Sequence, residues 1–338
     1  MPSYLMLLSP AANHVYRQAS GALAAAELAV TAPFAHSIRQ TTLAGAAALE
    51  FEADELDHLR LAAQSTQLVT FERVGDLLRP IELPRLAFFD DDLVTIPKYQ
   101  GKTNEVFTRL LLHLTLSAVQ RPGPLDVLDP LAGRGTTLLA AWQAGHHAYG
   151  VEADDKSFEA LSAYLKTYLR TKRIKHSAQV SPVRRDGRAI GRRLDAAARL
   201  GEATSAAPAR PGMPTLQLTV FTGDTRDSAV LYGRKRFDAI LTDAPYGVVH
   251  GAYRAKGPSP RDRSPRQLLS EAIPVWRGQL KPGGALGISW NTLTLPRAEL
   301  GRILLDAGLR PRDDDPWQQF GHRVDSSIHR DLMVATTS

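Results

Sequence analysis

One stretch decides the fold of this chain: Leu125-Asp126-Val127-Leu128-Asp129-Pro130-Leu131-Ala132-Gly133-Arg134-Gly135-Thr136-Thr137-Leu138-Leu139. A mostly apolar run ends in an acid, two closely spaced glycines come next, and a Leu/Ala-rich helical pattern begins. This order predicts a strand, a tight loop and a helix whose N-terminal N–H groups and positive dipole face a ligand.

Two common nucleotide-binding loops do not fit this stretch. A phosphate-binding loop ends in Gly-Lys-Ser/Thr, whereas Gly135 is followed by Thr136. A dinucleotide-binding loop has a third glycine three positions after Gly135, where Leu138 stands. The ligand of the loop must therefore be inferred from residues further along the chain.

Composition limits the class of protein. The 338 residues, 43% of them hydrophobic, allow one large core and a smaller unit. No apolar run is long enough to cross a bilayer, and the N-terminus lacks the basic start of a signal peptide. The absence of cysteine excludes disulfides and thiolate metal sites, so we expect a cytoplasmic protein without a membrane partner. The net charge of +6 permits an anionic partner without requiring one.

The first 95 residues predict a small α/β unit that carries no catalytic pattern. Strands are expected at residues 4–8, 44–51 and 68–74, and helices at 11–30, broken near Gly21, and 56–64. We interpret this unit as a packing or substrate-presenting domain. The acidic run Asp90-Asp91-Asp92 is more typical of a solvated turn than of a metal site.

Residues 96–338 predict a doubly wound, mostly parallel α/β sheet. Further strands are expected at 147–152, 216–221, 237–242 and 284–289, with closing strands at 317–319 and 328–334. Acids follow successive strands at Asp129, Glu152, Asp224 and Asp243. The carboxyl ends of parallel strands form one edge of such a sheet, and ligands bind there.

Two of these acids suit a nucleoside. Glu152, with Asp154 as the alternate, can accept hydrogen bonds from two ribose hydroxyls. Asp224 can accept one from the amino group of adenine. A helix with Thr103 as its N-cap precedes the first strand, and its start either lines the same pocket or is an ordinary capped helix.

The motif Asp243-Ala244-Pro245-Tyr246 suits methylation of an exocyclic amino group. The lone pair of such a nitrogen is delocalised into the ring, so hydrogen-bond acceptors are needed to make it nucleophilic. Asp243 offers a carboxylate and Ala244 a backbone carbonyl, Pro245 stiffens the turn, and Tyr246 can stack on a base. The alternative is a proline-containing turn after a buried strand.

Basic residues gather in two places. An insertion at about residues 172–215 carries many of them before it becomes Ala/Pro/Gly-rich, which predicts a flexible loop at 201–214. A second basic run follows Tyr246 directly. We interpret seven residues as phosphate contacts, the alternative being a solvated face: Arg173, Lys175, Arg184, Arg185, Arg188, Arg254 and Lys256.

Taken together, these motifs resemble the S-adenosylmethionine-dependent amino-methyltransferases with an (Asp/Asn)-Pro-Pro-Tyr motif. Within them the chain is most similar to the tRNA guanosine N2-methyltransferases that modify position ten, and to their bacterial relatives. The helix start Lys102-Thr103-Asn104-Glu105 and the segment 322–328 also look like that group. The resemblance covers roughly residues 95–338. In two respects the chain departs from the family: Ala244 replaces a proline, and residues 1–95 do not clearly show its THUMP RNA-binding domain.

The resemblance implies a seven-stranded Rossmann-like methyltransferase sheet, S-adenosylmethionine as cofactor, no metal, and RNA, in particular tRNA, as partner. It implies that Asp129 and the glycine loop hold the methionine end of the cofactor, Glu152 its ribose and Asp224 its adenine. The full implied cofactor-binding set is Thr103, Asn104, Asp129, Pro130, Gly133, Gly135, Thr136, Glu152 and Asp224. Asp243 and Tyr246 are implied to hold the target base, within a catalytic motif formed by Asp243, Ala244, Pro245 and Tyr246.

Other functions fit less well. Methylation of a DNA adenine or cytosine would require base flipping, and the insertion looks too short for a target-recognition domain. A catalytically silent nucleic-acid-binding protein would have no need of all four acids. The histidines form no metal-ligand pattern, His146 and His147 being adjacent, and no Gly-x-Ser-x-Gly nucleophile motif occurs.

Overall fold

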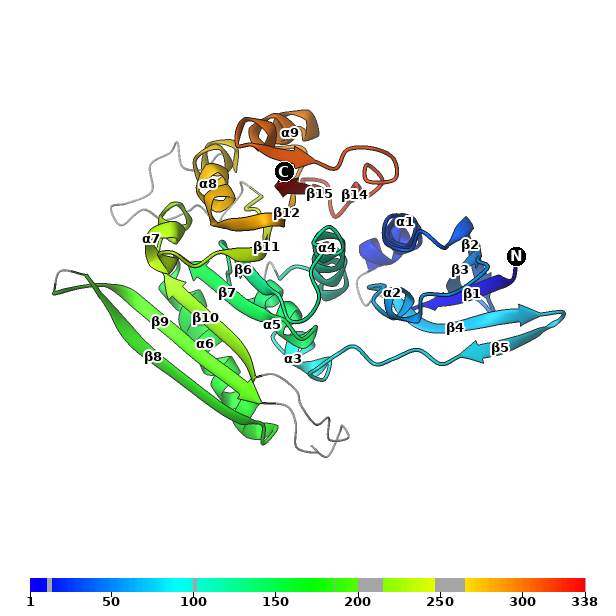
Figure 1. Ribbon diagram of the computed structural model, residues 1–338, viewed down its shortest axis with the longest axis horizontal. Coiled ribbons are helices and arrows are strands. Elements are labelled where there is room, and N and C mark those ends of the chain that lie inside the picture. The colour runs from blue at the N-terminus through cyan, green and yellow to red at the C-terminus, as the bar shows by residue number, and fades with distance from the viewer. Residues whose placement is uncertain (11–13, 100–101, 186, 200–214, 247–264, 338) are drawn as a thin grey trace.

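The computed structural model describes residues 1–337 except 11–13, 100–101, 186, 200–214 and 247–264. The described residues form a five-stranded sheet near the N-terminus and a ten-stranded sheet in the remainder of the chain (Figure 1). No described helix is long and apolar enough to span a bilayer.

The smaller sheet is antiparallel, with the order β2-β3-β1-β4-β5. Its strands are β1 (Ser3–Leu8), β2 (His36–Leu43), β3 (Ala46–Glu52), β4 (Gln67–Val74) and β5 (Leu77–Ile81), accompanied by helices α1 (His14–Thr31) and α2 (His58–Ala62). The sequence missed β2 and β5, which lie at the two edges and are largely exposed. The predicted break near Gly21 is wrong. A Cβ there would lie 2.5 Å from the Gln40 side chain, so Gly21 allows β2 to approach an unbroken α1.

The larger sheet has the order β13-β15-β12-β11-β6-β7-β10-β9-β8, with β14 paired to β15. Its central strands are β6 (Asp126–Asp129), β7 (His147–Glu152), β10 (Thr215–Thr222), β11 (Phe237–Asp243) and β12 (Leu280–Asn291). Neighbours among these five are parallel, as expected of an α/β fold. The other strands of the sheet pair antiparallel, so the sheet is mixed and not mostly parallel as predicted. The expected count of seven strands is replaced by ten.

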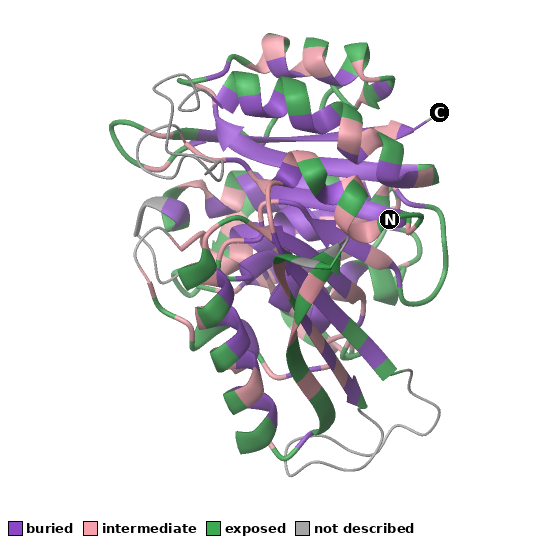
Figure 2. Ribbon diagram, turned by 90° about the vertical axis from the view of Figure 1, so that its left-hand side faces the viewer, coloured by how far each residue is buried: buried purple, intermediate pink, exposed green. Residues whose placement is uncertain are grey.

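Helices cover both faces of this sheet. Helices α4 (Glu105–Ser117), α5 (Thr136–Gln143) and α6 (Asp155–Thr171) pack in one core, and α8 (Pro265–Gln279) and α9 (Arg297–Asp306) in the other, beside α7 (Ser228–Tyr232). Figure 2 shows the buried strands between helices whose outer sides are exposed. The sheet is therefore doubly wound, as predicted.

The basic insertion begins as a long hairpin, which the sequence did not predict. Strands β8 (Lys175–Arg185) and β9 (Arg188–Arg199) pair along their whole length, and β9 adds to β10. Gly187 takes the positive φ of 77° that a tight two-residue turn requires. The loop predicted at 201–214 lies outside the described residues.

One predicted closing strand is wrong. Residues 317–319 form turns, in which Trp317 N donates to Asp314 O at 2.7 Å and Gln319 N to Pro316 O at 3.1 Å. The edge strand is instead β13 (Leu309–Pro311), and it pairs with β15 (His329–Thr337). The short β14 (His322–Arg323) pairs with the start of β15.

The acidic run at residues 90–92 is bound by cations. Asp90 pairs with Arg85 and Lys172, Asp91 with Arg109, and Asp92 with Lys172. Asp92 opens helix α3 (Asp92–Thr95) and accepts a hydrogen bond from Tyr168 at 2.7 Å. These contacts fasten the segment before α4 to α6.

Candidate active site

The carboxyl edge of the central sheet brings the predicted acids together. Strands β6, β7 and β11 end at Asp129, Glu152 and Asp243, and Asp224 follows the end of β10 by two residues. Because these strands are parallel neighbours in the order β11-β6-β7-β10, all four acids lie along one edge. The four acids thus lie where the sequence predicted, while their roles in binding and catalysis stay predictions.

The two loop glycines differ in their surroundings. Gly133 and Gly135 both have positive φ, of 53° and 85°. A Cβ on Gly135 would lie 2.6 Å from Leu161, so this glycine lets α6 pack closely. A Cβ on Gly133 would meet nothing within 4 Å. Gly133 therefore leaves open space beside the loop.

Buried Asp129 stands directly before the loop. Its Oδ1 accepts a hydrogen bond from Leu131 N at 3.0 Å. Burial raises the pKa of this carboxyl to about 7, against the opposing effect of hydrogen bonds that include Leu131 N and the Thr137 hydroxyl. Pro130 is buried beside it.

Glu152 is tied to the glycine loop. Its Oε2 accepts a hydrogen bond from Gly133 N at 2.6 Å, and its Oε1 accepts one from Asp154 N at 2.7 Å. Burial raises the pKa of this carboxyl. Each oxygen keeps a second acceptor site, as binding of two hydroxyls requires. Asp154, the alternate for that role, caps α6 by accepting from Ser157 N at 3.0 Å.

Asp224 is engaged by a neighbouring arginine that the sequence did not reveal. Its Oδ1 accepts from Arg226 N at 2.9 Å and Nε at 2.8 Å, and its Oδ2 from Arg226 Nη2 at 2.6 Å. Arg226 also pairs with Glu271 at 2.8 Å. Much of the acceptor capacity of Asp224 is therefore used within the protein, which leaves fewer sites for an adenine.

Three hydroxyls surround the Asp243 carboxylate. Its Oδ1 accepts from Tyr246 OH at 2.6 Å and from the Ser289 hydroxyl, and its Oδ2 accepts from the Thr103 hydroxyl. Four acceptor sites are available on a carboxylate, so one site on Oδ2 remains. Ala244 is buried, and its N–H donates to Ser289 O at 2.8 Å, which fixes the turn into Pro245.

The predicted N-cap of α4, Thr103, is wrong. Asn104 caps the helix, its Oδ1 accepting from Val106 N at 2.9 Å and Phe107 N at 3.3 Å. Thr103 is thereby released to reach Asp243, 140 positions later in the chain. Lys102 does not line the edge; it donates to Val94 O at 2.7 Å and pairs with Glu105.

Three residues at this edge were not predicted as site residues from the sequence: Tyr99, Ser289 and Arg330. Tyr99 OH and Thr136 Oγ1 share a hydrogen bond of 2.7 Å, and the Arg134 guanidinium lies 4.9 Å from the Tyr99 ring. Ser289 stands opposite Asp243 in the β11–β12 register. Only that register could have revealed Ser289, because a serine in an apolar strand carries no signal of its own.

The predicted phosphate contacts divide into three groups. Arg173, Lys175 and Arg184 are exposed. Arg185 and Arg188 lie opposite each other where the hairpin turns, and only their backbone is described. Arg254 and Lys256 lie outside the described residues, as does Gly247.

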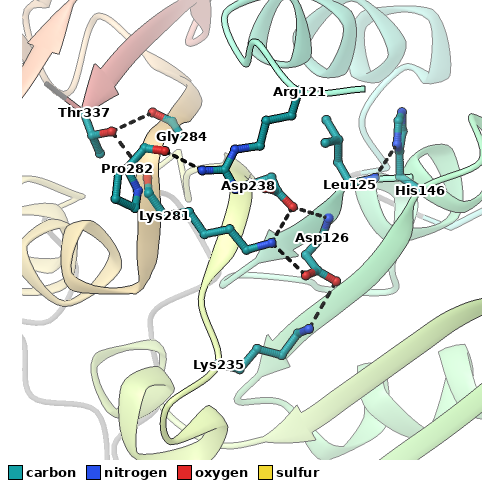
Figure 3. Close-up of polar contacts among 10 residues, drawn as sticks. All are labelled: Arg121, Leu125, Asp126, His146, Lys235, Asp238, Lys281, Pro282, Gly284 and Thr337. Carbon is teal, nitrogen blue, oxygen red and sulfur yellow. Dashed lines mark hydrogen bonds and ion pairs between the residues drawn. The ribbon is translucent and has the colours of Figure 1, made fainter. Parts of the chain in front are cut away.

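The opposite edge of the sheet carries a closed polar network (Figure 3). Lys281 Nζ donates to Asp126 Oδ2 at 3.1 Å and Asp238 Oδ2 at 2.8 Å, and Arg121 donates to Asp238 Oδ1 at 3.0 Å. A cavity of about 640 Å³ at this end is lined by residues that include Arg234, Lys235 and Arg236. The network consists of mutual pairs that join β6, β11 and β12. Within the described part of the chain, no cluster of three metal-ligating side chains was found.

No protein-family model and no curated protein matches the chain. Solved structures similar to it include TrmN from Thermus thermophilus, with 14% identity over 100% of both chains and a TM-score of 0.46. They also include the rRNA methyltransferase AviRa from Streptomyces viridochromogenes (13% identity, 74% of this chain and 91% of that one, TM-score 0.39). A third is TehB from Haemophilus influenzae (11%, TM-score 0.37), with 64% of this chain covered and 58% of TehB. With all three TM-scores below 0.5, these similarities do not establish a function.

Proposed function

We propose that the protein transfers a methyl group from S-adenosylmethionine to an exocyclic amino nitrogen of a nucleobase, namely guanosine N2 in tRNA. The observation that carries this proposal is the Asp243 carboxylate, held by three hydroxyl donors with one acceptor site left on Oδ2. A carboxylate held in this way can accept a hydrogen bond from one N–H of an incoming amine.

The remaining edge fits the methyl donor. Gly133 leaves space beside the loop, and Glu152 keeps two acceptor sites for ribose hydroxyls. When bound, S-adenosylmethionine supplies a methyl group on a positively charged sulfur. With the donor held beside the glycine loop and Glu152, its methyl group would pass to the nitrogen lone pair, and the C–S electron pair would stay with sulfur. The proton that the methylated nitrogen loses passes to water.

Asp243 would act on the amine by orientation. Its hydrogen bond to the N–H draws electron density toward the nitrogen and turns the lone pair out of the base plane. The three hydroxyl donors belong to the segment before α4, to β12 and to the turn after β11. The carboxylate is therefore held from three separate elements. Such positioning in a bound complex can supply about 7–11 kcal/mol of rate enhancement.

The hairpin supports a nucleic-acid substrate. β9 pairs with β10 up to Arg193 opposite Phe221, and Arg192 N donates to Thr222 Oγ1 at 2.8 Å where β10 ends. Residues 188–191 therefore continue past the carboxyl edge, by about 13 Å at the usual rise per residue. Arg184, Arg185 and Arg188 lie on the part of the hairpin that extends past this edge. A nucleic acid bound at the candidate site could therefore contact these arginines with its phosphates.

The test combines genetics and mass spectrometry. Nucleosides from the tRNA of cells without the protein should lack one N2-methylguanosine, and the native gene should restore it. Asp243→Ala should lower methyl transfer at least about 100-fold, because the acceptor for the amine is lost. Its affinity for S-adenosylmethionine should stay within a few-fold in calorimetry, since Asp243 is proposed to bind the base.

The outcomes separate the alternatives. A methylated adenine or cytosine that disappears from DNA would replace the RNA substrate with DNA. Absence of S-adenosylmethionine binding to the native protein would overturn the methyltransferase proposal. Full turnover by Asp243→Ala would remove Asp243 from the reaction.

A further inference from the structure

We propose that Arg330 is a positioning residue for the reaction proposed above: its guanidinium holds the Tyr246 ring in place, and through Tyr246 it orients the Asp243 carboxylate. The inference rests on the proposed function only for its kinetic consequences. The structural claim, that buried Arg330 holds the Tyr246 ring in place, does not depend on that function.

Arg330 lies between two aromatic rings. It belongs to β15 and is 6% exposed. Its Cζ is 5.0 Å from the centroid of Phe107 in α4 and 5.1 Å from the centroid of Tyr246. Both distances lie within the range in which a cation is attracted to an aromatic face. The guanidinium therefore joins the helix before the glycine loop to the motif after β11.

A buried cation needs compensation. The Nε of Arg330 is buried and has no hydrogen-bond partner among the described residues. Burial lowers the pKa of Arg330, but the charge of Asp243 and contact with Tyr246 outweigh burial and raise it. The negative charge of Asp243 therefore offsets part of the cost of burying Arg330, and the two rings replace part of the lost hydration.

The arrangement limits how Tyr246 can move. Its hydroxyl donates to Asp243 Oδ1 at 2.6 Å while its ring contacts the guanidinium. Any rotation of the ring away from Arg330 would draw the hydroxyl from Asp243. The direction of the remaining acceptor site on Oδ2 therefore depends on a residue that need not touch the base.

The aromatic ring of Phe107, beside Arg330, also contacts the N-terminal unit. Phe107 lies 5.1 Å from the His322 ring and 6.4 Å from the Tyr16 ring of α1. Burial lowers the pKa of His322 to about 4, which keeps this neighbour neutral at pH 7. His322 therefore adds no positive charge beside Arg330, whose guanidinium lies over the Tyr246 ring.

The experiment compares Arg330→Met, Arg330→Lys and the control Arg323→Met, which removes an exposed arginine from the neighbouring strand. Arg330→Met should lower kcat by up to about 100-fold, because misplacement of a reacting group by about 1 Å has effects of that size. The KM for S-adenosylmethionine should stay near the native value, because a change that acts only in the transition state lowers kcat without weakening substrate binding. Arg330→Lys should restore part of kcat, since it keeps the charge but not the planar group. Arg323→Met should behave as the native protein.

A second readout is independent of activity. With 3-fluorotyrosine incorporated, the 19F resonance of Tyr246, assigned by its loss in Tyr246→Phe, should shift and broaden in Arg330→Met and shift less in Arg330→Lys. It should be unchanged in Arg323→Met. If Arg330→Met does not fold, Arg330→Lys carries both measurements.

Two results would overturn the inference: an unmoved Tyr246 resonance in a folded Arg330 variant, or a native kcat in folded Arg330→Met. If the native protein shows no methyl transfer at all, the proposed function fails while the 19F experiment still decides the placement of Tyr246.

Discussion

Asp129 shows at the residue scale how position changes the chemistry of a carboxyl group. The sequence places it at the end of an apolar strand, where the carboxyl group is buried and its pKa rises to about 7. An unfolded chain has an aspartate pKa near 4. Between these values the native state holds a proton that the unfolded state has lost.

This difference predicts a pH-dependent stability. As pH rises from about 4 to 7, the native protein loses up to about 1.4 kcal/mol of stability per pH unit through Asp129. Asp129→Asn does not titrate and lacks this loss, so its stability relative to the native protein should increase over the same range. Urea unfolding at pH 5 and pH 8 measures the change. A constant difference between the two proteins would show that Asp129 is ionised throughout.

At the scale of elements, the hairpin β8–β9 is the feature that the sequence pattern does not reveal. Its strands are rich in serine, alanine and arginine and lack a regular alternation of apolar residues. The side chains that fix it belong to other elements. Arg192 pairs with Asp155 and Glu159 of α6, at 2.6 and 2.8 Å, and stacks on Phe158.

The hairpin's position predicts how RNA binding depends on salt. Replacing Arg184, Arg185 and Arg188 by glutamine should flatten the plot of log Kd against log salt, by up to about 0.9 per lost phosphate contact, or less for single-stranded RNA. Fluorescence anisotropy with labelled tRNA between low and high salt measures this slope. The control replaces Arg302, Arg310 and Arg312, which are exposed near the opposite edge strand. Equal slopes for both triple variants would make the hairpin tip a solvated surface.

At the scale of the whole molecule, α1 joins the two sheets. Leu28 of this helix belongs to the core of the small sheet, whereas Tyr16 and Leu23 belong to the core that contains α4 and α5. Fully buried Glu27 accepts hydrogen bonds from Ser65 N at 3.0 Å and Ser65 Oγ at 2.6 Å and lies 2.7 Å from His113 Nδ1 of α4. The domain boundary near residue 95 stays a prediction. Helix α1 lies before that boundary and packs in the cores of both units.

This contact predicts that the two units unfold together. Glu27→Ala should cost at least about 1.5–3 kcal/mol, the value of a hydrogen bond to a charged group. It should also split one calorimetric transition into two, because Ser65 and His113 lose their common partner. Glu55→Ala, at an exposed carboxylate in the same unit, is the control. A single transition with the stability of the control would contradict the coupling.

The strands that carry the candidate site could be predicted from the sequence alone. Apolar runs that end in acids located β6, β7, β10 and β11 to within about two residues, the usual precision of such boundaries. Local patterns suffice here because a buried parallel strand is apolar along its length, and polar residues follow it where the chain leaves the sheet. Asp129, Glu152, Asp224 and Asp243 follow from that rule.

Only the tertiary structure decided which partners these acids have. The hydroxyls of Thr103, Ser289 and Tyr246 meet at Asp243 from positions up to 140 residues away from it in the chain. Arg226 binds the carboxylate of Asp224. Arg330 reaches the site because β15 adds to β12 at the sheet's far side. The physical reason is that hydrogen bonds and charge pairs depend on distances set by strand order and register, and neither is encoded in the local pattern of a single segment.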